Sequence, residues 1–251
     1  MKKILLLICF AFLLSCSSDI IQENDWTKDN LNGEVKSITE TKHVALNYYD
    51  TEKKGKIIWY TKYDDKGNKL EESYNSNHLG TNFPGKNLYT YNNKNELLEQ
   101  HQYKNNGKLL IKALYELNKK GKHLEASWNY PDGSSFGKTT YKYNDHGKLT
   151  EEIWYLSDGS LDEKIRYKYD ISGNRIENKA YRSDGSLLYK FTYEYNERGN
   201  KIEEDIYNSD GEWEESIIYE YELDKRGNWT KKLAIKNEEP ISITERQYQY
   251  Y

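Results

Sequence analysis

Hydrophobic and polar residues alternate along most of the chain, and glycines interrupt the alternation at regular intervals. In Leu187 to Tyr195 the odd positions are Leu, Tyr, Phe, Tyr and Tyr, whereas the even positions include Lys190, Thr192 and Glu194. A period of two, with aromatic residues on one side and charge on the other, is typical of a half-buried β-strand. The pattern therefore predicts strands that each have one aromatic face and one polar face.

A unit of 26 residues repeats through the chain and is clearest from Tyr193 to Ile218. Two glycine series and one tyrosine series keep this spacing: Gly121, Gly147, Gly173 and Gly199; Gly107, Gly133, Gly159, Gly185 and Gly211; and Tyr89, Tyr115, Tyr141, Tyr167, Tyr193 and Tyr219. A fixed period of this length indicates a repeat architecture, in which each unit buries surface by stacking on its neighbours.

Each unit contains two turn signals. The first is Asn or Asp, two polar residues and Gly, as in Asn196 to Gly199, which suits a type I turn that ends in a left-handed residue. The second is an Asp-Gly or Asn-Gly step, such as Asp184-Gly185, which is a strong hairpin signal. Together they predict about sixteen strands, two per unit, the last running from Ile241 to Tyr251.

The number of strands constrains the architecture. A flat sheet of about sixteen strands, spaced ~4.8 Å apart, would be ~75 Å wide, and open sheets of more than ~10 strands curl. We therefore predict an all-β fold, an antiparallel hairpin meander coiled into a curved or spiral open sheet with the tyrosine face concave or self-packed. A transmembrane barrel is the alternative, since strands of ~10 alternating residues suit one. Its lipid-facing band must be uncharged, and neither face here is free of Lys and Glu.

The N-terminal residues follow a different pattern. Lys2 and Lys3 precede the apolar run Ile4 to Leu14, which is shorter than the ~20 residues that a transmembrane helix needs. The following sequence, Leu13-Leu14-Ser15-Cys16, resembles the lipobox of bacterial lipoproteins. An ordinary secretory peptide, in which the cysteine is incidental, is the alternative.

The lipobox resemblance implies a cellular location. It implies a signal peptide over residues 1–15, cleavage before Cys16, and a lipid anchor, with palmitate among its chains, on that cysteine. Several acyl chains on one residue give stable membrane attachment. In the sorting rules of bacterial lipoproteins Asp after the cysteine favours the inner membrane, so Ser17 implies the outer membrane, with the periplasmic or surface side left open.

Composition divides the chain into a tether and a domain, and it excludes nucleic acid as a partner. We predict a flexible tether over residues 16–31 and a single β-repeat domain over residues 32–251. The net charge of −4 excludes the basic footprint of a nucleic-acid-binding protein. The mean hydropathy of −1.05 would be typical of a disordered chain, but 25 tyrosines supply apolar surface for a thin sheet.

Three segments carry a second resemblance. Tyr63 to Asn68, Tyr169 to Asn174 and Tyr195 to Asn200 share a pattern that resembles the Tyr-Asp repeat of the Rhs/YD-repeat proteins, over roughly residues 57–236. In large members of that family the repeats spiral into a hollow β shell around a toxin. This chain lacks the long array, the core cassette and a toxin domain, so the resemblance implies the sheet geometry and not the encapsulating role.

The tyrosines supply the candidate binding surface. Pairs that recur every second strand would align as an aromatic stripe able to stack on sugar rings or on an extended polymer. These candidate ligand-binding residues are Tyr141, Tyr143, Tyr167, Tyr169, Tyr193, Tyr195, Tyr219 and Tyr221. The alternative is that the stripe is the core, because cross-strand aromatic pairs stabilise sheets.

Metal and catalytic signals are weak. Aligned glutamates could bind Ca²⁺, but carboxylates in this arrangement more often pair with lysines of adjacent strands, such as Lys142, Lys168 or Lys190. This series is Glu99, Glu125, Glu151, Glu177 and Glu203. The five histidines are scattered, and no nucleophile, phosphate-binding or zinc motif is present. We therefore predict no catalytic residue, no metal and no cofactor.

These observations favour a non-enzymatic, lipid-anchored cell-envelope protein that binds a glycan, a peptide or a protein partner through its repeat surface. The second hypothesis is a structural spacer, or a shell-like component of the envelope, without a discrete ligand. The third is a glycan hydrolase, because carboxylate pairs are plentiful, but neighbours such as Glu151 and Glu152 point to opposite faces of a strand.

Overall fold

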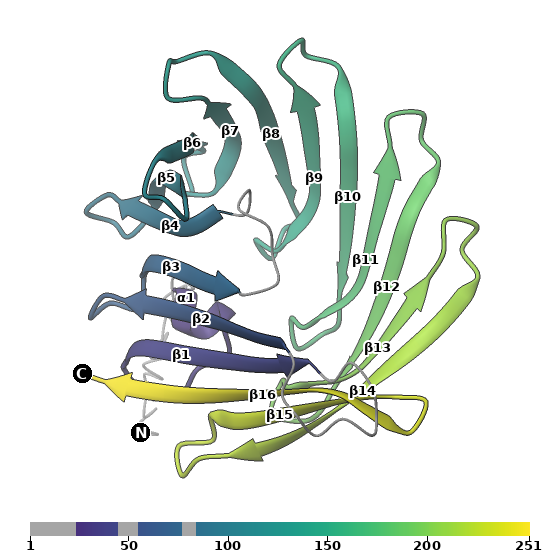
Figure 1. Cartoon of the computed structure of the whole chain (residues 1–251). Helices are drawn as coiled ribbons and strands as arrows, with labels where there is room; N and C mark the ends of the chain where they lie inside the picture. The colour runs from purple at the N-terminus through teal and green to yellow at the C-terminus, as the bar shows by residue number, and fades with distance from the viewer. Residues whose placement is uncertain (1–23, 45–54, 77–83) are drawn as a thin grey trace, which may run out of the picture.

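The computed structural model describes residues 24–44, 55–76 and 84–251. The predicted signal peptide and Cys16 lie outside the described residues. The described chain forms one helical turn and a succession of strands (Figure 1). The elements are α1 (Asp25–Lys28), β1 (Val35–Val44), β2 (Gly55–Tyr63), β3 (Lys69–Ser76), β4 (Pro84–Tyr91), β5 (Leu97–Lys104), β6 (Leu109–Leu117), β7 (His123–Asn129), β8 (Ser135–Tyr143), β9 (Leu149–Leu156), β10 (Leu161–Tyr169), β11 (Arg175–Arg182), β12 (Leu187–Tyr195), β13 (Lys201–Tyr207), β14 (Trp213–Leu223), β15 (Trp229–Lys236) and β16 (Glu239–Tyr250).

The sheet closes on itself. Consecutive strands pair antiparallel, and β1 also pairs with β16, from Val35 opposite Tyr250 to Val44 opposite Ser242. The strand number and the antiparallel hairpin order are as predicted, but the open curved or spiral sheet is wrong, because the sixteen strands form a closed barrel. An open sheet would leave the backbone groups of two long edge strands unpaired, and closure satisfies both edges.

The two turn series share one backbone geometry. The Gly199 amide donates to Asn196 O at 2.9 Å and the Gly185 amide donates to Arg182 O at 3.0 Å, with φ of +75° and +84°. Both are type I turns that end in a left-handed residue, as predicted for the first series. They differ in the supporting side chain: Asn196 Oδ1 accepts from the Asn200 amide at 3.0 Å, whereas Asp184 Oδ1 accepts from the Ser186 amide at 2.8 Å.

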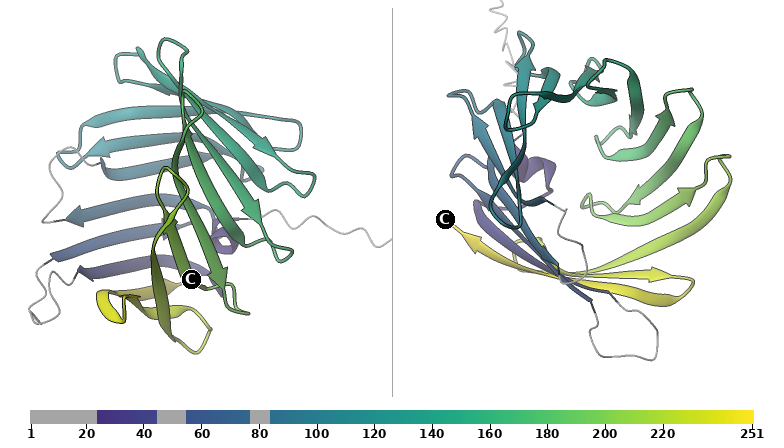
Figure 2. Two further views of the ribbon diagram at one scale, coloured as in Figure 1. Left: turned by 90° about the vertical axis from the view of Figure 1, so that its right-hand side faces the viewer. Right: turned by 45° about the horizontal axis from the view of Figure 1, so that its top comes forward.

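Alternation gives the barrel two chemically different walls. The tyrosines of β2 and β4 reach α1, with Tyr63 Oη donating to Asp29 Oδ2 at 2.7 Å and Tyr91 Oη donating to Asp25 Oδ2 at 2.9 Å. Since α1 lies inside the ring of strands (Figure 2), the tyrosine face is the inner wall. The glutamate series therefore lies on the outer wall, one residue out of phase with the tyrosines.

Buried hydrophobic residues form two small clusters, with Tyr167, Ala180 and Ala234 buried outside them, rather than one continuous core. One contains Ile111, Ala113, Ala126 and Trp128 on β6 and β7, and the other contains Val35, Ile38 and Tyr63 on β1 and β2. About eight strands give a barrel interior that side chains can fill, whereas a barrel of this strand number is too wide for opposite walls to meet. Most inner-wall side chains are accordingly half-buried.

Candidate functional site

The barrel places all eight predicted binding tyrosines on the inner wall. They occupy β8, β10, β12 and β14 in pairs, and the register sets Tyr141 opposite Glu152, Tyr193 opposite Glu204 and Tyr219 opposite Ala234. The repeat therefore brings residues from four hairpins to one curved surface. Within each pair, however, the two tyrosines have different surroundings.

The second tyrosine of most pairs holds neighbouring strands together. The hydroxyls of Tyr169, Tyr195 and Tyr221 donate to the carbonyl oxygens of Leu149, Arg175 and Lys201 at 2.7, 2.8 and 2.7 Å. Each acceptor is the first residue of the preceding strand. Burial raises the pKa of Tyr143, Tyr195 and Tyr221 to about 12, so these hydroxyls stay protonated at neutral pH. The hydroxyls of Tyr169, Tyr195 and Tyr221 are thus already used by the barrel itself.

The first tyrosine of three pairs carries a cation above one ring face. The Arg175 guanidinium lies 4.6 Å from the ring centre of Tyr167, and Lys201 Nζ lies 4.8 Å from that of Tyr193. Tyr219 is flanked by Lys201 Nζ at 5.1 Å and by Lys232 Nζ at 5.7 Å. Cations in these positions are attracted to the electron-rich ring face. The tyrosine stripe is therefore a row of rings capped by charge, not a bare stacking surface.

Basic side chains gather on the inner wall where β13 to β16 meet. The Arg246 guanidinium stacks 3.7 Å from the ring centre of Trp229, and its Nε donates to Glu40 Oε2 at 2.7 Å. Lys232 Nζ lies 5.0 Å from the same indole. Burial lowers the pKa of Lys232, and nearby Arg246 and Lys201 lower it further, while Glu40 opposes the shift.

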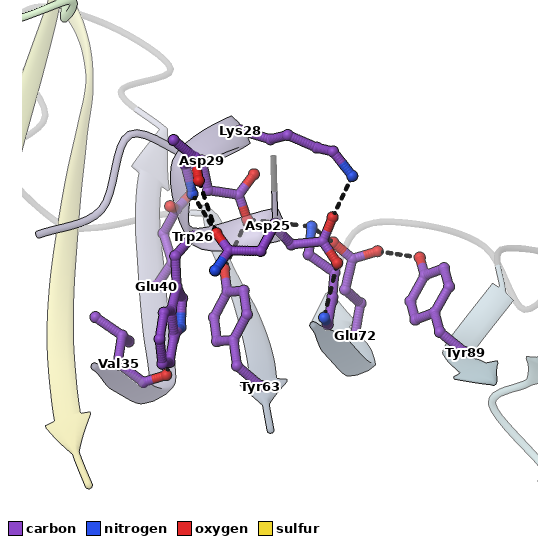
Figure 3. Close-up of polar contacts among 12 residues, drawn as sticks. Asp25, Trp26, Lys28, Asp29, Val35, Glu40, Tyr63, Glu72 and Tyr89 are labelled. Carbon is purple, nitrogen blue, oxygen red and sulfur yellow. Dashed lines mark hydrogen bonds and ion pairs between the residues drawn. The ribbon is translucent and has the colours of Figure 1, made fainter. Parts of the chain in front are cut away.

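Carboxylates occupy other parts of the inner wall. Burial raises the pKa of Glu152, against opposing contributions from Tyr167 and Arg175. Nearer α1, Glu72 accepts from Tyr89 Oη at 2.5 Å and pairs with Lys69 Nζ at 2.8 Å. Figure 3 shows Glu72 and Tyr89 beside α1. The inner wall thus carries aromatic, basic and acidic groups.

The N-terminal segment, residues 24–33, lies against one rim of the barrel. Asn24 caps α1 through the Thr27 amide at 3.0 Å, and the Trp26 indole donates to Val35 O at 2.7 Å (Figure 3). The Asp25 amide donates to Gly67 O at 2.9 Å, in the turn that joins β2 to β3. The segment is therefore docked on the wall that carries Tyr63 and Tyr91.

The same segment continues to two further turns of this rim. Asn30 Nδ2 donates to Arg198 O at 3.0 Å, and the Asn32 amide donates to Asn228 Oδ1 at 2.7 Å. Asn200 and Asn228, which follow the turn glycines, are 8% and 2% exposed. β14 has 11 residues where β12 has 9, so the turn that meets Asn32 is displaced from the regular repeat. This docking was not predicted from the sequence, in which the capping residue Asn24 and a tryptophan in a polar stretch were its only signals.

Four of the five glutamates of the series form ion pairs on the outer wall, and Glu203 is the exception among the described residues. Glu151 pairs with Lys142 at 2.6 Å and with Arg166 at 2.9 Å, and Glu177 pairs with Lys168 at 2.9 Å. These are the lysine pairs expected, except that Lys190 lies 3.6 Å from the ring centre of Tyr207 instead. Among the described residues no group of three or more His, Cys, Asp or Glu side chains could hold a metal ion.

Comparison with protein families and curated proteins identifies no function. Residues 126–247 match a family model described only as an uncharacterised protein, which is slightly less than half of the chain. No curated protein matches the sequence.

One solved structure has a similar fold. A porin-like protein from Bacteroides uniformis superposes with a TM-score of 0.57 and 14% identity, over 87% of this chain and 99% of that one. A porin-like protein from Bacteroides vulgatus gives 0.42 and 12%, over 86% and 98%, and a TcdB2–TccC3 structure gives 0.36 and 17%, over 74% and 10%. Only the first score is high enough for a structural argument, and at its identity it shows the fold alone. The chain is therefore a closed antiparallel barrel, similar in fold to the porin-like protein of Bacteroides uniformis.

Proposed function

We propose that this protein is a non-enzymatic barrel of the cell envelope, attached to the outer membrane through a lipidated Cys16, that binds a ligand on its inner wall. The observation that carries the proposal is the composition of that wall. Tyrosine and tryptophan rings, cations and carboxylates line it, and most of these side chains are half-buried rather than packed into a core. Binding sites combine apolar and aromatic surface with a few well-placed polar groups in this way.

The outer wall supports attachment to the membrane rather than insertion into it. A transmembrane barrel presents an uncharged band to lipid. Here, salt bridges join adjacent strands of the outer wall, including Glu125 with Lys138 at 2.9 Å, Glu151 with Arg166 at 2.9 Å and Glu177 with Lys168 at 2.9 Å. A lipid on Cys16 would supply the membrane affinity that this surface lacks. Incorporation of labelled palmitate, lost in Cys16→Ser, tests the anchor separately.

Ligand binding is tested with the purified mature protein and a panel of neutral and acidic oligosaccharides and of peptides, by isothermal titration calorimetry. Tyr167→Ala and Tyr193→Ala should weaken the binding of any ligand found by about tenfold, equivalent to ~1.4 kcal/mol. Tyr155→Ala is the matched control, since Tyr155 lies on β9 with its ring on the outer wall beside Lys138 at 5.5 Å.

Two outcomes would contradict the proposal. Binding that is lost in Tyr155→Ala but unchanged in the inner-wall variants would place the ligand on the outer wall. A mature protein that binds nothing in the panel, and whose co-purifying partners are unaffected by either class of variant, would favour the structural spacer instead.

A further inference from the structure

We propose that the inner wall formed by β13 to β16 and β1 binds an oxyanion, a carboxylate or a phosphate, carried by the ligand. This inference rests on the proposed inner-wall binding and names the chemistry of one part of it. We call this part the basic site and define it by Lys42, Lys201, Lys232 and Arg246.

The register brings the basic site together from strands that are distant in sequence. Lys232 on β15 lies opposite Thr244 on β16, which lies opposite Lys42 on β1. One pair further along β16, Arg246 lies opposite Glu40. Closure of the barrel is what places Lys42 beside the other cations, because β1 and β16 meet only at the seam.

The carboxylates of this region are already paired. Glu40 accepts from Arg246 Nε at 2.7 Å, and Glu204 pairs with Lys201 while accepting from Tyr219 Oη at 3.3 Å. Lys42 and Lys232 form no ion pair within 4 Å among the residues that the structure describes. The basic site thus holds four cations and two carboxylates.

Aromatic rings form the floor beneath these cations. Lys232 Nζ lies over Trp229 and Tyr219, and Arg246 lies over Trp229. Ring faces recover part of the solvation that a half-buried ammonium loses, but they are weaker partners than a carboxylate. The lowered pKa of Lys232, caused first by burial, is consistent with a missing anionic partner. A ligand oxyanion between Lys42 and Lys232 would supply that partner, with hydrogen bonds that charge strengthens.

The experiment uses the mature protein and three probes: inorganic phosphate, a galacturonic acid trisaccharide and a neutral galactose trisaccharide. Binding is followed by calorimetry and by the ¹³Cε NMR signal of Lys232, assigned by comparison with Lys232→Gln. We expect at least one acidic probe to bind, to raise the pKa of Lys232, and to weaken about tenfold or more at about 0.5 M salt, because the contact is ionic. Phosphate alone, or galacturonate alone, would identify the source of the oxyanion.

Adjacent lysines provide the matched control. Lys232→Gln and Lys42→Gln should each weaken binding of the acidic probe about tenfold, equivalent to ~1.4 kcal/mol. Lys231→Gln should leave it unchanged, because Lys231 lies on the outer wall and pairs with Glu222 at 2.8 Å. Thermal unfolding of each variant confirms that the barrel is folded.

The proposal is overturned if neither acidic probe moves the Lys232 signal at millimolar concentration, or if Lys231→Gln weakens binding as much as Lys232→Gln. It is also overturned if the neutral trisaccharide binds as tightly as the acidic one and the binding responds to Tyr193→Ala but not to Lys232→Gln. In that last case inner-wall binding, and with it the proposed function, remains.

Discussion

Adjacent residues of one strand point to different walls of the barrel, and their pKa values shift in opposite directions. On β9, burial raises the pKa of outer-wall Glu151, but hydrogen bonds from Lys142 and Arg166 outweigh it and keep that pKa below its usual range. Burial alone dominates for inner-wall Glu152, whose pKa is raised. A shift of one residue along a strand therefore changes a carboxylate from a paired surface charge with a lowered pKa to one whose pKa is raised by burial.

The same contrast recurs on β15 with lysines. The hydrogen bond to Glu222 raises the pKa of outer-wall Lys231, whereas burial lowers the pKa of inner-wall Lys232. Charges on the outer wall neutralise each other across adjacent strands. Outer-wall cations such as Lys138 and Arg166 also lie over tyrosine rings, but each pairs with a carboxylate as well. Inner-wall Lys232 lies over rings and has no such pair among the described residues, and that difference is why the inner wall is the better candidate for ligand binding.

The largest expected effect comes from a comparison of two tryptophans, one inside the barrel and one exposed. Trp26 packs inside the barrel on Val35 and Tyr63, so Trp26→Ala should lower the free energy of unfolding by about 3 kcal/mol through lost burial and a cavity. Trp213 is 58% exposed, so Trp213→Ala should cost about 1 kcal/mol or less. Urea unfolding of both variants measures the two losses of stability. A loss for Trp26→Ala as small as that for Trp213→Ala would mean that residues 24–33 do not contribute to the fold.

A second test uses pH. His123 stacks 4.4 Å from the ring centre of Tyr115, and burial lowers its pKa to about 4. In the unfolded chain the pKa of His123 is ~6.5, so the unfolded state binds the proton first as the pH falls. The contribution of neutral His123 to stability is therefore complete above about pH 6.5 and is lost between about pH 6.5 and pH 4. The loss should be on the order of 2–3 kcal/mol at most.

The matched measurement for His123 is a difference between proteins. Unfolding free energies of the wild type and His123→Gln, taken at several pH values, remove the contribution of carboxylates that titrate in the same window. The gap between the two proteins should shrink as the pH falls towards 4. A constant gap would show that His123 is not buried as described.

A third test separates the two kinds of tyrosine. Tyr195→Phe leaves the Arg175 carbonyl without its donor at 2.8 Å and should lower stability by about 1 kcal/mol. Tyr207 lies on the outer wall, and its hydroxyl forms no hydrogen bond within the described part of the chain, so Tyr207→Phe should change stability by less than about 0.5 kcal/mol. A neutral Tyr195→Phe would return this hydroxyl to the set available for a ligand.

The smallest expected effect comes from the adjacent glutamates of β9, and it tests their assignment to opposite walls directly. Glu151→Gln breaks pairs with Lys142 and Arg166 and should destabilise the protein by about 0.5 kcal/mol at neutral pH. Glu152→Gln removes a charge that burial disfavours and should be neutral or stabilising by a similar amount. Thermal unfolding that gave both variants the same sign would contradict the assignment of walls.

Local chemistry in the sequence determined the strands, their number and their two faces. The turn from Asn196 to Gly199 needs only four residues in a row to form, and the alternation from Leu187 to Tyr195 fixes which side chains share a wall. The eight tyrosines were correctly placed on one face for the same reason. These features are set within one hairpin, so a short stretch of sequence contains their cause.

Tertiary structure alone decided closure, docking and the character of the site. Glu40 meets Arg246 only because the two ends of the sheet pair, and Asn32 meets Asn228 only because the rim turns come together. The division of the tyrosines, and the cations over their rings, depend on contacts between strands rather than within one. A sheet with two long unpaired edges can close or remain open with the same local sequence pattern. The reason is that the N–H and C=O groups that pair at the edges are the same in every residue except proline.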